Sequence, residues 1–564
     1  MRNKTLNVVV GGEAGQGLVT IGQLLAKSLV RSGYSIIAGQ SYHSRVRGGH
    51  NTYAVRFGSD EVLSPEESID ILVALNEETI EIHRNELAPS AIVIADESFG
   101  IIGSSIVKVP FKKLDNARVL NVLAFGVLGK ILCLDKELLL KIIEEFFGRK
   151  NPAALQENNQ ALEKAYEWAA KIPPDFCRLP PLKNPPSRLM MTGHDAIALG
   201  AMSAGLKFYA FYPMTPSTSI GQTLAANANK MGMVVEQGED EIAVINLALG
   251  ASYAGAPAMV GTAGGGFALM VESVSLAAMT ETPIVIVVGQ RPAPATGLPT
   301  RTEQADLEFI LHSGHGEFPR AVFAPGTIEE CFHLTRKSLE LAQKYQSPVF
   351  ILSDQFTADS ERAVKPFDLD SLSFVQPGKD ASPASLPYKR YQFTGSGVSL
   401  RLLPGMSEHL VIADSDEHDE QGHLTEDLSI RKKMVEKRLK KMDGLVSEVI
   451  APEFSGDKDP ELLLVCWGSS KGSVLEAAAD LRASGEKVCV LHFSQLWPLK
   501  PAQFLEYLEK AKTAVMIEGN ALGQMSRLIR RETGFEFAKQ VHRYDGLAIT
   551  PEFIHRSLKE AGVR

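Results

Sequence analysis

The segment "AMVGTAGGGFALMVESVSLAAMT", residues 258–280, joins an apolar strand to an apolar helix through three glycines. The same order of strand, glycine-rich turn and helix recurs at "LNVVVGGEAGQGLVTIGQLLAKSLVRSGY" (6–34) and at further places along the chain. Such repetition is typical of α/β architecture. Because glycine has no side chain, the backbone at Gly264, Gly265 and Gly266 can approach a flat ligand closely. We therefore predict an α/β fold in which this bend borders a binding site.

The chain of 564 residues is too long for one hydrophobic core, and we expect three or four domains. Two proline-rich or irregular stretches, "IPPDFCRLPPLKNPPSR" (172–188) and "SFVQPGKDASPASLPYKR" (373–390), indicate linkers. The predicted order is a Rossmann-like domain over 1–175, a linker over 176–188, an α/β domain over 189–370, a linker with an irregular insert over 371–455 and a last α/β domain over 456–564.

The overall composition excludes several classes of protein. The net charge of −9 argues against a dedicated nucleic-acid binder, which usually carries a basic stripe. No apolar run reaches the roughly 20 residues that span a bilayer, and no signal peptide precedes the first strand. We therefore expect a cytoplasmic protein without a membrane partner. The five cysteines are scattered, so we expect isolated buried thiols and neither a disulfide framework nor a zinc or iron–sulfur site.

A rigid corner, "FYPMTPSTSI" (211–220), follows the apolar stretch "GLKFYAFY". Pro213 and Pro216 exclude a helix interior or a central strand at this point. We predict that Pro216 lies in the first turn of a helix with Thr215 as its N-cap. The corner would then offer hydroxyls and unpaired amides at the end of a strand, where α/β sheets bind ligands and where anions are favoured. Plain helix capping remains the alternative.

Two charged residues are predicted near the same end of the sheet. Glu241 directly precedes the apolar pattern "IAVINLALGA", so its carboxylate is either a surface complement to the helix dipole or a partly desolvated group that shares a proton with a ligand. Arg291 follows the strand "PIVIVVG" and is either a surface charge or a clamp for a carboxylate. Thr215, Glu241, the glycine bend and Arg291 together indicate one shared cleft.

Three other segments allow alternative interpretations. The loop "GGEAGQG" (11–17) is either a phosphate-binding turn or a tight turn, and Arg45 and Arg47 lie in a basic loop that suits an anionic ligand, a partner or solvent. The acidic loop at 414–427 is interpreted as a solvated or interface loop rather than a metal site. The segment "IEGNALGQMSRLIRRE" (517–532) is assigned to fold and interface rather than to catalysis.

The combined motifs resemble those of a known family. Five of them are "FYPMTPST", "EDEIAVINLALGASYAGA", "GTAGGGFALMVES", "GQRPAPATGLPTRTEQADL" and "HGEFPRAVFAP". Together they resemble the α subunit of 2-oxoacid:ferredoxin oxidoreductases. The N-terminal motifs "GGEAGQG" and "SRVRGGHNTYAVR" resemble the γ domain of that family, fused in front of α as in the 2-oxoglutarate type. The resemblance covers nearly the whole chain.

The resemblance implies a role for each residue of the expected cleft. It implies a pyrimidine-binding domain for thiamine diphosphate over 189–370 and a transketolase-C-terminal-like domain over 456–564. Glu241 matches the glutamate that hydrogen-bonds the cofactor's aminopyrimidine, and Thr215, in the motif that contains Pro213, matches a threonine that contacts the substrate. Arg291 matches the arginine that pairs with the 2-oxoacid carboxylate. The family loop often reads TSGPG where this chain has "TAGGG", so the resemblance implies a more mobile bend at Gly264–Gly266 that loses no functional group.

The sequence also lacks parts that the implied reaction needs. It has no "GDG" motif to hold diphosphate and magnesium and no CxxC motif to hold an iron–sulfur cluster. The resemblance therefore implies a β subunit that carries Mg²⁺ and a [4Fe–4S] cluster, in a heterodimer or an (αβ)₂ assembly, with coenzyme A as co-substrate and ferredoxin as electron acceptor. No metal ligand is expected in this chain.

The expected function is oxidative decarboxylation of a 2-oxoacid, by the resemblance 2-oxoglutarate, to an acyl-CoA. Pyruvate or another 2-oxoacid is the alternative substrate. A different thiamine enzyme would need its own diphosphate site, which the sequence lacks. A non-catalytic scaffold or regulatory subunit with a degenerate cleft is the alternative from another class, and the retained Thr215, Glu241 and Arg291 argue against it.

Overall fold

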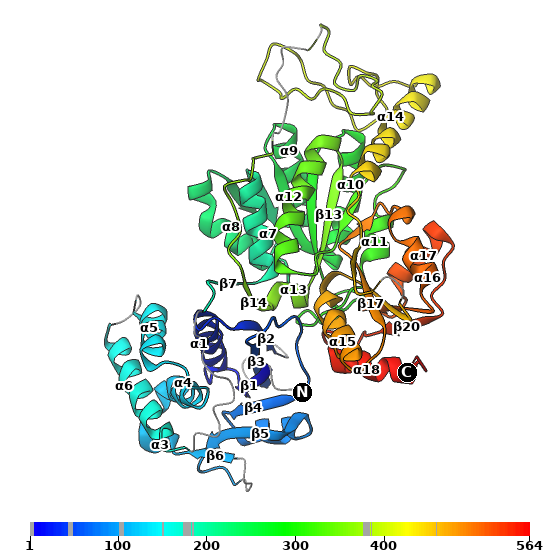
Figure 1. Cartoon of the computed structure of the whole chain (residues 1–564). Coiled ribbons are helices and arrows are strands. Elements are labelled where there is room, and N and C mark those ends of the chain that lie inside the picture. The colour runs from blue at the N-terminus through cyan, green and yellow to red at the C-terminus, as the bar shows by residue number, and fades with distance from the viewer. Residues whose placement is uncertain are drawn as a thin grey trace. The chain divides into compact units, whose positions relative to one another are not determined.

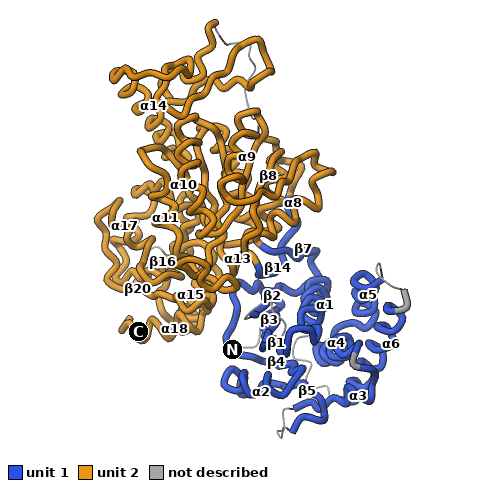
Figure 2. Tube along the Cα trace, turned by 180° about the vertical axis from the view of Figure 1, so that it is seen from behind, with its two compact units in different colours: residues 1–192, 359–367 blue, residues 193–358, 368–564 orange. Residues whose placement is uncertain are grey.

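The computed structural model describes residues 5–42, 49–100, 106–148, 152–172, 182, 185–375, 384, 386–457 and 460–563. The chain divides into two compact units, which Figure 2 shows in separate colours. The first unit contains residues 1–192 together with 359–367, and the second contains 193–358 together with 368–564. The return of 359–367 to the first unit is a feature that no local sequence signal indicates.

The first unit is built on a mixed eight-stranded sheet. Strands β1, β4, β5 and β6 run parallel, whereas β3 is antiparallel and separates β1 from β2. In spatial order the strands are β6 (Ile106–Val109), β5 (Leu87–Asp96), β4 (Ile69–Ala74), β1 (Thr5–Glu13), β3 (His50–Gly58), β2 (Ser35–Ser41), β14 (Glu361–Val364) and β7 (Leu189–Met191). The helices are α1 (Leu18–Arg31), α2 (Glu77–His83), α3 (Phe111–Leu114), α4 (Leu120–Ile131), α5 (Lys136–Phe147) and α6 (Pro152–Ala169).

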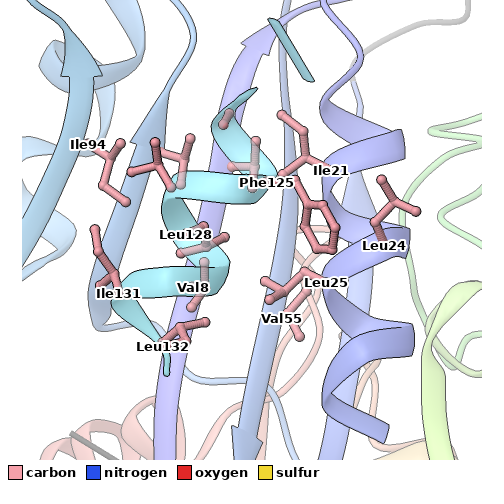
Figure 3. Packing of buried hydrophobic residues seen from close by; sticks show 14 of the residues in the cluster. Val8, Ile21, Leu24, Leu25, Val55, Ile94, Phe125, Leu128, Ile131 and Leu132 are labelled. Carbon is pink, nitrogen blue, oxygen red and sulfur yellow. The ribbon is translucent and has the colours of Figure 1, made fainter. Parts of the chain in front are cut away.

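The core of this unit lies between the sheet and helices α1 and α4. Figure 3 shows Leu25 of α1 and Leu128 of α4 close to Val8 and Val55 of the central strands. Their burial supplies the apolar area that holds helices on a sheet. The loop "GGEAGQG" ends β1 and leads into α1, whose N-cap Gly17 has a φ of 81°. That conformation accounts for the glycine by backbone geometry, and phosphate binding at the loop stays a prediction. Arg45 and Arg47 lie outside the described residues.

The second unit contains a seven-stranded sheet that is parallel except for one edge strand, β18. In spatial order the strands are β18 (Gln495–Trp497), β12 (Ala321–Phe323), β13 (Pro348–Asp354), β11 (Ile284–Gln290), β10 (Ala258–Ala263), β8 (Phe208–Phe211) and β9 (Val234–Gln237). Its helices are α7 (Gly193–Ala204), α8 (Thr218–Met231), α9 (Glu241–Tyr253), α10 (Gly264–Met279), α11 (Leu307–His312), α12 (Ile328–Tyr345) and α13 (Gln355–Asp359).

The order of these strands creates a switch point in the sheet. The chain passes from β8 to β9 in one direction and then returns past β8 to β10. Helices α7, α8 and α12 therefore pack together on one face, and α9 and α10 pack together on the other (Figure 1). In open α/β sheets, ligands bind in the crevice beyond the carboxyl ends of the strands at such a point.

A smaller sheet follows in the same unit. Four of its strands are parallel and β15 is antiparallel at the edge. The strands are, in spatial order, β15 (Glu453–Ser455), β17 (Val488–Phe493), β16 (Leu462–Trp467), β19 (Thr513–Glu518) and β20 (Lys539–His542), and the helices are α15 (Lys471–Ala483), α16 (Leu505–Lys510), α17 (Gln524–Thr533) and α18 (Pro551–Glu560). One hydrophobic cluster continues from this sheet into the helices α9 and α10, so the two sheets share a core.

The insert between the two sheets contains one long helix, α14 (Leu428–Ser447). Glu417, in the acidic loop, forms ion pairs with Arg431 and Arg438, and His418 is buried against Tyr391 with ring centroids 4.0 Å apart. This part of the loop is therefore packed against the rest of the unit, which disagrees with the solvated alternative and leaves the interface alternative a prediction. Within the described residues no cluster of metal-ligating side chains is found.

The cysteines agree only in part with the sequence-based expectation. Cys331, Cys466 and Cys489 are buried and form no disulfide, as expected of isolated thiols. Cys133 is disulfide-bonded, so the expectation is wrong for this residue, and Cys177 lies outside the described residues. Among the helices of the described segments, none combines the length and the apolar character needed to cross a membrane.

Candidate active site

The proline corner connects the end of β8 to helix α8. Helix α8 begins at Thr218 with Ser217 at the N-cap, so the prediction that Thr215 caps the helix and that Pro216 lies in its first turn is wrong. The Thr218 amide instead donates to the Met214 carbonyl at 3.1 Å, and the Ser217 hydroxyl donates to the same oxygen at 2.9 Å. These bonds form a separate turn before the helix. Pro213, at the start of the corner, is exposed.

The corner packs directly on the end of β11. A Cβ atom at Gly289 would lie 2.8 Å from Cγ of Pro216, so only glycine allows this approach. Two residues further on, Arg291 donates from Nη1 to the Thr215 carbonyl oxygen at 2.6 Å. The structure thus brings together two of the residues that the sequence predicted as neighbours. The contact uses the Thr215 backbone and leaves its side chain available.

Glu241 is the first residue of α9 and is buried, with 3% of its surface exposed. Asp240 caps this helix by accepting from the Ala243 amide at 2.7 Å, so Glu241 is not needed as the cap. Its Oε1 atom is buried and has no hydrogen-bond partner among the described residues. A buried carboxylate oxygen without a partner costs stability, which is typical of a group held ready for a ligand.

The three glycines begin helix α10 after β10, and each position has a distinct surrounding. A Cβ atom at Gly266 would lie 2.4 Å from Oε1 of Glu241, so the glutamate side chain reaches the first turn of α10. A Cβ atom at Gly264 would lie 2.7 Å and 2.8 Å from the carboxylate oxygens of Asp306. Gly265 is exposed and faces open space apart from the Ala295 carbonyl at 3.8 Å. The bend therefore has a carboxylate on either side of an open backbone surface.

Asp306 is a site residue that the sequence reasoning did not single out. It is 8% exposed, and burial raises its pKa to about 6, although the positive charge of Arg291 acts in the opposite direction. Desolvation lowers the pKa of the Arg291 guanidinium, and Asp306 acts against that change. Asp306 lies fifteen residues after Arg291, in the motif "GQRPAPATGLPTRTEQADL". The sequence alone did not single it out, because a lone aspartate at a helix start usually indicates an ordinary N-cap.

The loop from Arg291 to Asp306 is anchored by the smaller sheet. The Gln304 side chain donates to the Trp467 carbonyl at 2.9 Å and accepts from the Gly519 amide at 2.8 Å. Asn520 and Gln524 donate to the backbone carbonyls of residues 304 and 305. The segment 517–532, interpreted from sequence as fold and interface, therefore also fixes the loop that borders the site.

The arrangement suits an aromatic, hydrogen-bonding cofactor that carries a basic ring nitrogen. The unpartnered oxygen of Glu241 can accept or share a proton, and the glycines of α10 leave backbone exposed beside it. At the corner after β8, Arg291 bonds the Thr215 backbone and, with the Thr215 hydroxyl, provides polar groups suited to a small anion. These residues fit the pyrimidine half of thiamine diphosphate together with a 2-oxoacid.

Comparison with known proteins gives matches over both units. Residues 199–437 match the family model "Pyruvate flavodoxin/ferredoxin oxidoreductase, thiamine diP-bdg", and residues 7–168 match "Pyruvate ferredoxin/flavodoxin oxidoreductase". Residues 199–437 therefore form a thiamine-diphosphate-binding domain, which contains every residue of the site described above.

Full-length relatives extend the match to nearly the whole chain. A 2-oxoacid:ferredoxin oxidoreductase subunit alpha from Aeropyrum pernix is 30% identical over 96% of this chain and 95% of its own length. The subunit alpha of the same enzyme from Saccharolobus solfataricus is 29% identical over 98% and 97%. The solved structure of 2-oxoglutarate:ferredoxin oxidoreductase from Magnetococcus marinus, with 2-oxoglutarate, coenzyme A and succinyl-CoA bound, superposes with a TM-score of 0.93 at 31% identity and covers 99% of both chains.

Proposed function

Since the chain belongs to the alpha subunits of the 2-oxoacid:ferredoxin oxidoreductase family, we propose that it supplies the acid–base and substrate-binding half of an enzyme that oxidatively decarboxylates 2-oxoglutarate. The reaction would convert the 2-oxoacid and coenzyme A to an acyl-CoA and CO₂, releasing two electrons to ferredoxin and one proton to solvent. The structure of the Magnetococcus marinus relative, which holds 2-oxoglutarate, supports this choice of substrate. Pyruvate or another 2-oxoacid remains the alternative.

The observation that carries the proposal is the buried, unpartnered carboxylate oxygen of Glu241 beside the glycine bend. When bound, thiamine diphosphate supplies the carbon nucleophile and the electron sink for decarboxylation. Glu241 would hold a proton shared with the pyrimidine ring, and the low dielectric around this carboxylate strengthens that hydrogen bond. The backbone at Gly265 and Gly266 would line the ring without side chains in the way.

Arg291 and Thr215 would orient the substrate. A guanidinium pairs with a carboxylate through two parallel hydrogen bonds, and the bond from Nη1 to the Thr215 carbonyl leaves the other donors of Arg291 for this purpose. The Thr215 hydroxyl lies on the same corner and can donate to a substrate oxygen. Since the 2-oxoacid carboxylate is lost as CO₂, fixing its direction relative to the cofactor is the main task of these two residues.

Exposed apolar side chains on the helices next to Glu241 support the proposal that a partner subunit binds there. Helices α9 and α10 expose three large apolar side chains, Ile242 and Leu247 on α9 and Leu269 on α10, with 49%, 45% and 51% of their surfaces accessible. Large exposed apolar residues on helices that border an incomplete site are typical of a subunit interface. We propose that the β subunit, carrying the diphosphate, Mg²⁺ and [4Fe–4S] sites that this sequence lacks, docks on these two helices.

This docking surface leads to a direct prediction. Leu247→Glu should weaken association with the β subunit by roughly tenfold or more, because a charge would be buried in the centre of an apolar interface. Leu424→Glu, at a somewhat more exposed leucine of the insert, is the matched control and should associate normally. Analytical ultracentrifugation of the mixed subunits measures both. Equal affinities for the two variants would place the interface elsewhere.

The enzymatic proposal is tested by assaying the chain with its β partner for 2-oxoacid-dependent reduction of methyl viologen. We expect reduction only when both subunits, thiamine diphosphate, Mg²⁺ and coenzyme A are present, and the fastest rate with 2-oxoglutarate in a panel that includes pyruvate. A faster rate with pyruvate would reassign the substrate. No rate with any 2-oxoacid would favour the scaffold alternative.

A further inference from the structure

The Asp306 side chain occupies the N-cap position of α11 but does not cap it. Both carboxylate oxygens instead lie against Gly264, at the start of the sixteen-residue helix α10. No hydrogen bond to either oxygen is found within the described part of the chain. The Asp306 side chain is thus largely buried, with 8% of its surface exposed, and lies against the glycine bend without a hydrogen bond that would fix its charge.

The backbone of Asp306 is held firmly from several directions. Its amide donates to Oε1 of Gln290, the last residue of β11, at 3.0 Å, and its carbonyl accepts from the Ile310 amide at 2.9 Å. The preceding residues are fixed through Gln304 and Gln524 to the smaller sheet. The carboxylate therefore has little freedom to turn away when a charged ligand arrives.

Two ionisable groups, Arg291 and Glu303, interact electrostatically with Asp306. Glu241 lies on the other side of the glycine bend, against Gly266. Arg291, on the loop after β11, attracts Asp306, although the two side chains lie beyond the 4 Å of an ion pair. Glu303, on the same loop, repels it, and burial followed by this repulsion raises the pKa of Glu303. Helix α10 contributes only glycines in its first turn, and β11 contributes the neutral Gln290. Before any substrate binds, the positive charge of Arg291 is thus the attraction that offsets the repulsion between Asp306 and Glu303.

We propose that Asp306 couples 2-oxoacid binding to the uptake of one proton: the anionic substrate binds Arg291 while Asp306 becomes neutral. The inference rests on the proposed function, in which Arg291 pairs with the carboxylate of the substrate. A second carboxylate placed on Arg291 removes part of the attraction that stabilises ionised Asp306 and adds a like charge near it. Both effects favour the protonated form, so the proton enters Asp306 from solvent as the ligand binds.

The sign of the pH dependence follows from linkage. A group whose pKa rises when a ligand binds takes up a proton in that step. The affinity that this proton uptake adds is fully present at pH values below the pKa that the group has before the ligand binds. That pKa is about 6 for Asp306. Affinity should therefore fall as the pH rises from 6 to 8, by at most tenfold per pH unit. Without Asp306 the affinity at pH 8 should be higher, because the competing negative charge is gone.

The test uses isothermal titration calorimetry of the complex of this chain with its β subunit and thiamine diphosphate. The titrant is the 2-hydroxy analogue of the 2-oxoacid that the viologen assay selects, because it keeps the carboxylate and cannot be decarboxylated. Titrations at pH 6, 7 and 8 in two buffers of different ionisation enthalpy give the number of protons taken up. We expect up to one proton for the unaltered chain and close to none for Asp306→Asn, which should bind more tightly than the unaltered chain at pH 8.

Glu303→Gln is the control, since it removes the neighbouring acid and should retain the proton uptake. The inference is overturned if Asp306→Asn takes up as many protons as the unaltered complex, if it binds more weakly at every pH, or if Glu303→Gln alone abolishes the uptake. Binding by the unaltered complex without proton uptake would overturn this inference and leave the proposed function standing. Absence of binding at any pH would overturn both.

Discussion

Glu241→Gln is expected to reduce the turnover of the assembled enzyme by roughly 10²- to 10⁴-fold, the range attributed to a general acid–base group. Glutamine keeps the shape of the side chain but cannot share a proton in the same way. The free chain should lose no stability and should melt at the same or a higher temperature, because Oε1 of Glu241 is buried without a partner and an amide is less costly to bury than a carboxylate. Activity and stability should therefore change independently.

The matched control is Glu239→Gln, which removes a carboxylate two residues earlier at an exposed position. It should alter neither quantity by more than a small factor. Methyl viologen reduction measures activity, and differential scanning calorimetry of the chain alone measures stability. If Glu241→Gln keeps half of the rate, the catalytic assignment fails. If it unfolds the chain, the carboxylate has a structural role instead.

The sequence placed the main elements of the site because their positions follow from local rules. Carboxyl ends of parallel strands meet at one edge, so residues that directly follow β8, β10 and β11 are brought together by topology alone. The corner, the glycine bend and Arg291 each satisfy that condition. Glu241 follows β9 by four residues and reaches the bend through the return of the chain past β8.

Asp306 could not be found by the same reasoning, because its place depends on distant contacts. The loop that carries it is fixed through Gln304 by Gly519, the residue after β19, and by Gln524 of α17, more than two hundred positions later in the chain. The predicted helix start at Thr215 was wrong for a similar reason. Pro216 is fixed against Gly289 on another strand, and the turn around Met214 delays the helix to Thr218.

The second large effect is expected at a network that sequence patterns conceal. Helix α14 contains the highly charged stretch "RKKMVEKRLKKM", a pattern that is typical of a solvent-exposed helix. In the structure, however, Lys437 and Lys441 of this helix are buried. Lysines are almost never fully buried unless they are paired. Their partner is Glu281, a fully buried residue that follows α10 and lies more than 150 positions earlier. Periodicity alone does not reveal such a pairing.

Three cations surround this carboxylate. Lys437 donates to both oxygens of Glu281 at 2.7 Å and 2.9 Å, and Lys441 lies 2.5 Å from Oε2. Arg390 donates to the Glu281 carbonyl at 2.8 Å and to Oε1 of Gln346 at 2.8 Å. Burial alone would raise the pKa of Glu281, but attraction by Lys441, Lys437 and Arg390 outweighs it and holds this pKa well below its usual range. The network joins Arg390 and α14 to the segment that follows α10.

We expect Glu281→Gln to destabilise the second unit by about 3–5 kcal/mol, because it leaves two buried ammonium groups without a counter-charge. Protection from hydrogen–deuterium exchange should fall along α14 and the segment 386–402, and the urea midpoint should fall with it. Lys440→Met, on the outer side of the same helix, is the control and should leave both unchanged. Adding Lys437→Met and Lys441→Met to Glu281→Gln should recover much of the loss, since the uncompensated charges are then removed as well. Unchanged protection of α14 in Glu281→Gln would show that apolar packing, and not this ion network, holds the insert in place.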